Sequence, residues 1–135
     1  MLVVAACIAA ACGSGGDKSE PTARAGGVTL LDAQAYRQAI GAFADPFVVN
    51  VHVPYEGEIE GTDAFVAFDQ IDQHVAELPA DKSAPLYIYC RSGRMSAEAT
   101  PVLQRLGYTN IIDLKGGMNA WREAGLPLVN MEGRP

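Results

Sequence analysis

The feature that most constrains the fold of this chain is the alternation of short apolar, β-branched runs with runs of helical periodicity. The run at 46–53 is typical of a buried strand, because β-branched side chains suit a sheet that is covered on both sides. The run at 69–78 looks helical, since Ile71, Val75 and Leu78 would share one helix face. Strands that alternate with helices predict a small α/β domain with a parallel sheet covered on both faces.

The same patterns predict where the elements lie. Asp32 is a suitable N-cap for the first helix, and Gly107 is a suitable end for the third. Pro101 lies inside the third helical pattern, where it marks either the true start or a kink. The connection at 54–68 is predicted to contain a short extended piece. We expect strands at 28–31, 46–53, 85–90 and 110–114, and helices at 32–43, 69–78, 96–107 and 116–125.

Composition narrows the function classes. Of the 135 residues, 49% are hydrophobic and 19% are charged, which is enough apolar material for one domain with a real core. Trp121, Tyr87 and Tyr89 are predicted to belong to this core. The net charge of −6 argues against a nucleic-acid partner, because nucleic-acid binders usually carry a basic face.

The N-terminal segment is interpreted separately from the domain. Residues 1–12 are apolar and uncharged, too short to span a bilayer comfortably, and 13–27 form a Gly/Ser-rich polar linker. An apolar run followed by small residues, a cysteine and a linker resembles a bacterial lipoprotein signal. Cys12, which meets the linker directly, is the preferred lipid-attachment residue, and Cys7 is the alternative. A plain cleaved signal is the other interpretation.

The resemblance to a lipoprotein signal implies where the protein resides. We expect an exported protein, tethered by lipid to the periplasmic face of a membrane, which would be the outer membrane in a Gram-negative source. The domain itself is predicted to span 28–130, followed by a short tail at 131–135.

Cys90 is the one cysteine outside the leader and ends an apolar strand. In an open α/β sheet, ligands bind at the carboxyl ends of the strands. The residues after Cys90 lead into a helix N-terminus, where backbone N–H groups are unpaired and favour anions. Gly93 lets the loop curl, while Arg91 and Arg94 add positive charge. Such surroundings favour a thiolate, so the pattern predicts a nucleophilic sulfur that handles small anions.

Two stretches resemble the single-domain rhodanese family of sulfurtransferases. The first is the loop CRSGRMS after a β-run, and the second is LGYTNIIDLKGGMNAWREAGLPL at 106–128. The resemblance covers about 28–129. It implies a central five-stranded parallel sheet flanked by helices, and a cysteine that carries a persulfide. The persulfide sulfur would come from a small anionic donor such as thiosulfate and pass to cyanide or a thiol acceptor.

The resemblance also implies which residues form the site. Cys90 would be catalytic, and no cofactor or metal is expected. We expect Arg94 to be the main anion contact and Arg91 to face solvent. The predicted substrate-binding residues are Arg91, Ser92, Gly93, Arg94, Met95 and Ser96.

Several positions depart from the family pattern. Many members have arginine where this chain has Met95. The second strand usually reads Ile-Asp-Val-Arg, whereas here Asn50 and His52 replace the acidic and basic residues. His52 could bind substrate or act as a base, but a structural replacement for arginine is the preferred interpretation. Glu56, Glu58 and Glu60 are interpreted as a solvated rim, and nothing at 52–60 has a spacing typical of metal ligands.

Two other function classes stay open. Phosphatases on the same general scaffold place an arginine six residues after the cysteine, and here that residue is Ser96. A non-catalytic sulfur-carrier or anion-binding module is the second alternative, because Asn50, His52 and Met95 differ from the family pattern.

Overall fold

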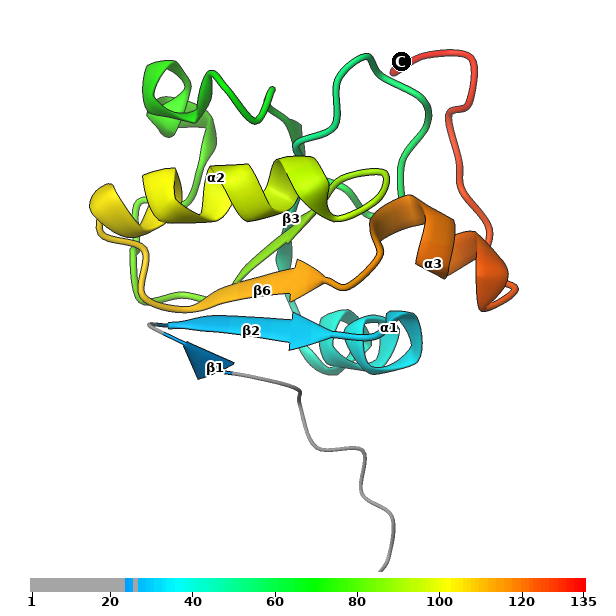
Figure 1. Ribbon diagram of the computed structural model, residues 1–135, viewed down its shortest axis with the longest axis horizontal. Coiled ribbons are helices and arrows are strands. Elements are labelled where there is room, and N and C mark those ends of the chain that lie inside the picture. The colour runs from blue at the N-terminus through cyan, green and yellow to red at the C-terminus, as the bar shows by residue number, and fades with distance from the viewer. Residues whose placement is uncertain (1–23, 26) are drawn as a thin grey trace, which may run out of the picture.

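The domain is built around one sheet of six strands in the order β1-β2-β6-β5-β3-β4 (Figure 1). The computed structural model describes residues 24–25 and 27–135. The strands are β1 (Arg24–Ala25), β2 (Val28–Leu31), β3 (Phe47–Asn50), β4 (Ala64–Phe65), β5 (Leu86–Tyr89) and β6 (Ile111–Leu114).

Five of these strands run parallel, as the resemblance to the rhodanese family implied. β4 is the short extended piece expected in the connection at 54–68. β1 adds an antiparallel edge, since Arg24 pairs with Thr29 and Ala25 pairs with Val28. The last residues of the predicted linker therefore join the sheet, while the leader at 1–12, including Cys12, lies outside the described residues.

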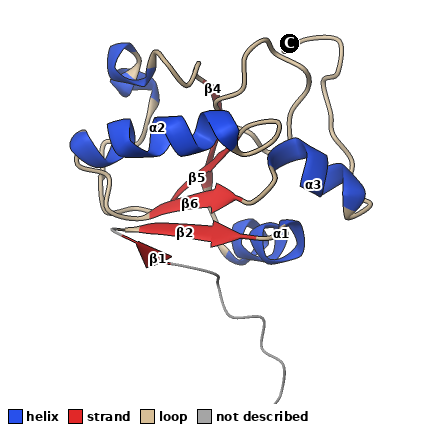
Figure 2. Ribbon diagram, in the orientation of Figure 1, coloured by secondary structure: helices blue, strands red, loops and turns tan. Residues whose placement is uncertain are grey.

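Three α-helices cover the sheet: α1 (Ala33–Ala42), α2 (Arg94–Arg105) and α3 (Gly117–Glu123) (Figure 2). Asp32 caps α1 as predicted, because its carboxylate accepts the Ala35 N–H over 2.8 Å. α2 begins two residues earlier than predicted and continues through Pro101 to Arg105. Gly107 follows it in the left-handed region, with φ of 96°.

The two faces of the sheet carry separate apolar cores. α2 packs Ala99 and Leu103 onto one face, where they meet Ile88 and Ile111. α1 and α3 cover the other face with a second set of buried side chains. There the Tyr36 ring contacts Tyr87 and Trp121 edge to face, with centroids 5.6 and 6.5 Å apart. Burial of Tyr87, Tyr89 and Trp121 confirms their assignment to the core.

The prediction of a helix at 69–78 is wrong. The segment forms two short 3₁₀ turns, η1 (Ile71–Gln73) and η2 (Val75–Glu77), separated by His74 with φ of −119°. Pro79 follows immediately, and the residue before a proline prefers an extended conformation, which Leu78 adopts with ψ of 162°. Ile71 is buried as the pattern required, but Val75 is only partly covered, so the shared apolar face does not form.

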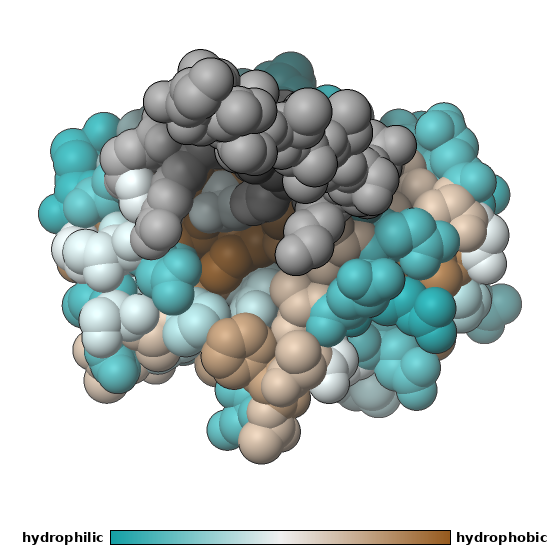
Figure 3. All heavy atoms as spheres, turned by 90° about the horizontal axis from the view of Figure 1, so that it is seen from below, coloured by the Kyte–Doolittle hydropathy of each residue, from teal (hydrophilic) through white to brown (hydrophobic). Residues whose placement is uncertain are grey.

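The face of the domain that is seen from below carries both hydrophilic and apolar residues. In this view the hydrophilic residues lie mainly toward the two sides, and apolar residues gather toward the centre (Figure 3). Phe43 and Met131 are the large apolar side chains exposed among the described residues. Within the described ranges, none of the helices has the length and apolar character needed to cross a membrane.

Candidate active site

Cys90 follows β5 at the carboxyl edge of the sheet, beside the N-terminus of α2. Its side chain is buried, with the residue 1% exposed. The Gly93 N–H donates a hydrogen bond to Cys90 Sγ over 3.0 Å, and the Cys90 thiol donates to Ser96 Oγ over 3.6 Å. An amide hydrogen bond to sulfur stabilises its anionic form, so the loop provides the surroundings expected of a nucleophilic cysteine.

The first turn of α2 completes the loop around the sulfur. Gly93 is the N-cap with φ of 98°, a left-handed conformation that glycine adopts without steric cost. The first backbone N–H groups of a helix have no acceptor within that helix, and they form the positive end of its dipole. Because α2 begins at Arg94, the amides of Arg94, Met95 and Ser96 all belong to this first turn. These three amides are the backbone donors from which the predicted anion cradle would be built.

The N-terminus of α3 supports the loop from behind. The Met118 N–H donates to the Cys90 carbonyl over 2.9 Å, and the Asn119 N–H donates to the Arg91 carbonyl over 3.0 Å. Gly117 makes this approach possible, because a Cβ at that residue would lie only 2.3 Å from Cys90 O. Two segments far apart in the sequence thus fix the backbone of the nucleophile.

The two loop arginines are both engaged by carboxylates. Arg91 Nη1 lies 3.3 Å from Glu56 Oε2, and Arg94 Nη1 lies 2.7 Å from Glu98 Oε1. Their side chains are 57% and 66% exposed. The expectation that Arg91 faces solvent is thus met in part, and Arg94 faces solvent at least as much.

The other predicted substrate-binding residues lie in different surroundings. Ser92 is exposed at the outside of the loop, and Met95 packs against the core on the α2 side of the sheet. Ser96 is fully buried beside the sulfur. The structure therefore brings Gly93 and Ser96 to Cys90 Sγ, whereas the Met95 side chain points into the core.

Asn50 and His52, which stand where the family pattern has an acidic and a basic residue, both form hydrogen bonds within the domain. Asn50 is buried, donates to Gly57 O over 3.1 Å and accepts the His52 N–H over 2.9 Å. An aspartate could accept the second bond but could not donate the first. His52 Nε2 lies 2.5 Å from Glu56 Oε2. Hydrogen bonding from His52, with the charge of Arg91 beside it, lowers the pKa of Glu56.

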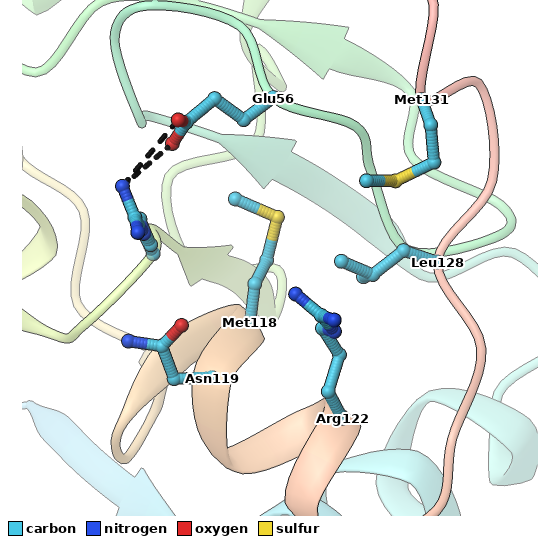
Figure 4. A pocket seen from close by; sticks show the side chains of 7 residues that line it. Glu56, Met118, Asn119, Arg122, Leu128 and Met131 are labelled. Atoms are coloured by element: carbon cyan, nitrogen blue, oxygen red, sulfur yellow. Dashed lines mark hydrogen bonds and ion pairs between the residues drawn. The ribbon is translucent and has the colours of Figure 1, made fainter.

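A pocket of about 130 Å³ opens beside the loop. Glu56 lies on one side of it, and α3 contributes Met118 and Arg122 (Figure 4). Arg91 also lines the pocket. The remaining lining residues are Asn119, Leu128 and Met131. Arg94 is not among the lining residues. Arg91 and Arg122 are the cationic side chains that line this pocket next to the loop.

The family assignment follows from this fold and loop together with a sequence comparison. The family model described as the Rhodanese-like domain matches residues 24–124. The chain belongs to the rhodanese-like family.

Relatives of this rhodanese-like domain include sulfurtransferases. A sulfurtransferase of Allochromatium vinosum is 34% identical over 110 residues, which cover 78% of this chain and 99% of that protein. The thiosulfate sulfurtransferase PspE of Escherichia coli is 25% identical over 80 residues, or 58% of this chain and 77% of that protein. A rhodanese-related protein from Thermoplasma volcanium superposes with a TM-score of 0.62 at 26% identity, covering 73% of this chain and 95% of that one.

Asp113 is a buried residue beside the site that the sequence analysis missed. It lies on β6, next to Ile88 of β5, and is 3% exposed. Burial raises its pKa to about 7, although hydrogen bonds from Ser96 and from the Leu114 N–H lower it in part. The signal was available, because a charged residue interrupts the apolar run at 110–114 of this rhodanese-like domain.

The interpretation of Glu58 as a solvated rim residue is wrong. Glu58 is 5% exposed and accepts a hydrogen bond from Asn130 over 2.6 Å. Arg134 Nε lies 3.2 Å from Glu58 Oε2, and the backbones of Glu58 and Val129 pair as a β-bridge. The C-terminal tail of the domain therefore neutralises a carboxylate that the fold buries.

Across 24–25 and 27–135, no cluster of three or more His, Cys, Asp or Glu side chains could hold a metal ion.

Proposed function

We propose that this protein is a sulfurtransferase that moves sulfane sulfur from a donor such as thiosulfate to a thiophilic acceptor through a persulfide on Cys90. The observation that carries the proposal is the position of Cys90 Sγ, which accepts the Gly93 N–H at the first turn of α2 in a rhodanese-like loop. The sulfurtransferase relatives support transfer of sulfur groups as the reaction class.

The proposed chemistry needs only the cysteine and its cradle. The Cys90 thiolate attacks the outer sulfur of thiosulfate, and the S–S bond of thiosulfate breaks with its electron pair leaving on sulfite. The outer sulfur of the resulting persulfide is then attacked by cyanide or by a thiolate, which releases Cys90 as thiolate again. Backbone N–H groups and nearby guanidinium groups would stabilise the negative charge on donor and persulfide.

The pocket beside the loop fits the approach of an anionic substrate. Among the described residues, the Arg122 guanidinium forms no ion pair, and the Arg91 guanidinium has only its long contact with Glu56. A donor or acceptor that carries a sulfonate or carboxylate would meet both charges before it reaches the loop. We therefore assign the entry of small anions to this side of the site.

Intact mass spectrometry of the purified full chain tests the proposal directly. Thiosulfate should add one sulfur atom, and cyanide should remove it with formation of thiocyanate. The Cys90→Ser variant should gain no sulfur, while the matched Cys12→Ser variant should behave as the wild type. Full thiosulfate:cyanide activity in Cys90→Ser would disprove the mechanism.

Turnover and phosphate-release assays, run beside the mass measurement, separate the alternative classes. A persulfide that forms but does not turn over with any acceptor would favour the non-catalytic sulfur-carrier module. Release of phosphate from an aryl phosphate without sulfur uptake would favour the phosphatase. Ser96 occupies the position where that class needs an arginine, and it is fully buried.

We also propose that the domain is exported and held by lipid at Cys12, as the leader pattern suggests. The proposal rests on residues 1–12 and the linker alone. It is independent of the sulfurtransferase reaction, and its test is given in the Discussion.

A further inference from the structure

His52 departs from the family pattern, and the proposed function gives it no role. It follows β3 at the carboxyl edge of the sheet. There the Val51 N–H donates to the Tyr89 carbonyl over 2.9 Å, so the segments after β3 and β5 continue side by side. The residue is only 5% exposed, yet its ring nitrogen Nε2 lies 2.5 Å from Oε2 of Glu56, a residue that lines the pocket beside the loop.

Asn50 fixes the backbone segment that carries this pair. Its side-chain amide donates to Gly57 O over 3.1 Å, and its side-chain oxygen accepts the His52 N–H over 2.9 Å. Both ends of 52–57 are thus bonded to one side chain, which is itself fully buried. Within this segment the His52 ring is buried, whereas the Glu56 side chain is 42% exposed. Glu56 is therefore the partner that can change its position.

The hydrogen between these two side chains is carried by His52. Hydrogen bonding from His52 and the charge of Arg91 lower the pKa of Glu56, so its carboxylate is ionised at neutral pH and can only accept. His52 Nε2 is therefore the donor. The other ring nitrogen, Nδ1, is buried and has no hydrogen-bond partner among the described residues. The only hydrogen bond of the ring is thus the one to Glu56.

Glu56 contacts Arg91 much less closely than it contacts His52. Arg91 Nη1 lies 3.4 Å from Oε1 and 3.3 Å from Oε2 of Glu56, the two contacts drawn as dashed lines in Figure 4. Charge-assisted N–H···O bonds are usually about 2.7–2.9 Å long. The pair of Arg94 and Glu98 on α2 has such a length, 2.7 Å. The Arg91 guanidinium therefore keeps most of its hydrogen-bonding capacity beside the pocket that it lines.

We propose that His52 is a positioning residue that holds the Glu56 carboxylate away from Arg91, which leaves the Arg91 guanidinium free to bind an anionic sulfur donor. The proposal rests on the proposed function, in which such a donor enters through this pocket. Without the hydrogen bond from His52, Glu56 would turn to its other partner, Arg91, and compete with the donor for it. With that bond in place, the donor replaces a long contact rather than a close ion pair.

Steady-state kinetics with thiosulfate and cyanide give the first test. His52→Leu removes the N–H donor but keeps an apolar side chain of similar size. It should raise KM for thiosulfate about threefold, the scale of an exposed ion pair, with little change in kcat. His52→Gln keeps an N–H donor at a similar distance from the backbone and should behave as the wild type. His74→Leu is the matched control, because His74 bonds to Glu77 over 2.7 Å outside the pocket lining. That control should leave KM unchanged.

Glu56→Gln separates this role from a purely structural one. Because Glu56 competes with the donor for Arg91, Glu56→Gln should lower KM for thiosulfate. The double variant His52→Leu/Glu56→Gln should share that low KM, since a competitor that is absent needs no positioning. A KM that does not fall in Glu56→Gln, or that stays raised in the double variant, would overturn the proposal. The first of these outcomes does not depend on whether His52→Leu folds.

A readout without sulfur transfer distinguishes this proposal from the proposed function. Iodoacetate and iodoacetamide both alkylate the Cys90 peptide, but only iodoacetate is an anion, so the ratio of their rates reports the positive charge available near the sulfur. The ratio should fall in His52→Leu, rise in Glu56→Gln and match the wild type in His52→Gln. That order in a protein that gains no sulfur from thiosulfate would support the role of His52 and reject the proposed function. Equal ratios in all variants would overturn the role of His52 even if thiosulfate turns over.

Discussion

Gly117 lies against the backbone of Cys90 so closely that a Cβ at Gly117 would sit 2.3 Å from Cys90 O and 2.7 Å from Arg91 O. The residue has φ of 58°, so a side chain there would also be strained by conformation. This contact joins the first turn of α3 to the segment that carries the nucleophile.

We expect Gly117→Ala to disturb the site and the fold together. The obstructing atoms are backbone, which cannot rotate away, so the loop or α3 must move. A loss of about 2–4 kcal/mol in the free energy of unfolding is expected, measured by urea denaturation. Gly41→Ala is a matched control, because nothing lies within 4 Å of a Cβ at Gly41. Equal stability of the two variants would contradict the expectation.

Arg91 and Arg94 make different contributions in this geometry. Arg91 lines the pocket beside the loop, whereas Arg94 is bonded to Glu98 along α2 and lies outside the lining. We therefore expect Arg91→Ala to lower kcat/KM for thiosulfate about tenfold, which corresponds to about 1.4 kcal/mol, and Arg94→Ala to lower it less. The sequence alone favoured the reverse order. A larger loss of kcat/KM in Arg94→Ala than in Arg91→Ala would show that Arg94 is the main anion contact.

The sequence predicted the sheet because its signal is local. Apolar β-branched runs mark strands wherever they occur, and a strand followed by a helical run requires a crossover to a parallel neighbour. The position of Cys90 at the carboxyl edge follows from that topology. The backbone cradle follows in turn, since the loop leads directly into α2.

The features that the sequence analysis missed depend on contacts between distant segments. In the sequence alone, Gly117 cannot be told from an ordinary turn glycine, because its importance comes from the packing of α3 against the Cys90 loop. Glu58 reads as solvent-exposed until the chain brings Arg134 and Asn130 to it. The helix predicted at 69–78 fails for a similar reason, because packing of Ile71 and the adjacent Pro79 decide the backbone more strongly than the periodicity does.

The buried carboxyl of Asp113 should leave a signature in the pH dependence of stability. Its pKa is about 7 in the folded protein, against an ordinary value of 3.8. Below about pH 4 the group is protonated in both the folded and the unfolded chain, and as the pH rises towards 7 only the unfolded chain ionises freely. The contribution of the neutral carboxyl to stability is therefore present at acid pH and lost as the pH rises through about 7.

Asp113→Asn cannot undergo this loss. The free energy of unfolding of the wild type, minus that of the variant, should fall by on the order of 2–4 kcal/mol between about pH 4 and about pH 8. Urea denaturation at several pH values measures this difference in the free energy of unfolding. The change of the difference with pH is the informative quantity, more than its size at any one pH. A difference that stays constant with pH would mean that Asp113 ionises equally in the folded and unfolded chain.

Lipid attachment is the remaining expectation from the leader, and Cys7 and Cys12 allow it to be tested cleanly. Cleavage before Cys12 would leave its thiol modified by diacylglycerol and its amine acylated, and several acyl chains anchor a protein stably where one chain does so only marginally. The Gly/Ser-rich linker would then let the rhodanese-like domain stand away from the membrane surface. In a bacterium that processes lipoproteins, labelled palmitate should enter the wild type and the Cys7→Ala variant but not Cys12→Ala.

Label retained in Cys12→Ala and lost in Cys7→Ala would show that the lipid is attached at Cys7. An unlipidated wild-type protein in the soluble periplasmic fraction would exclude the anchor while leaving the chemistry of Cys90 unaffected.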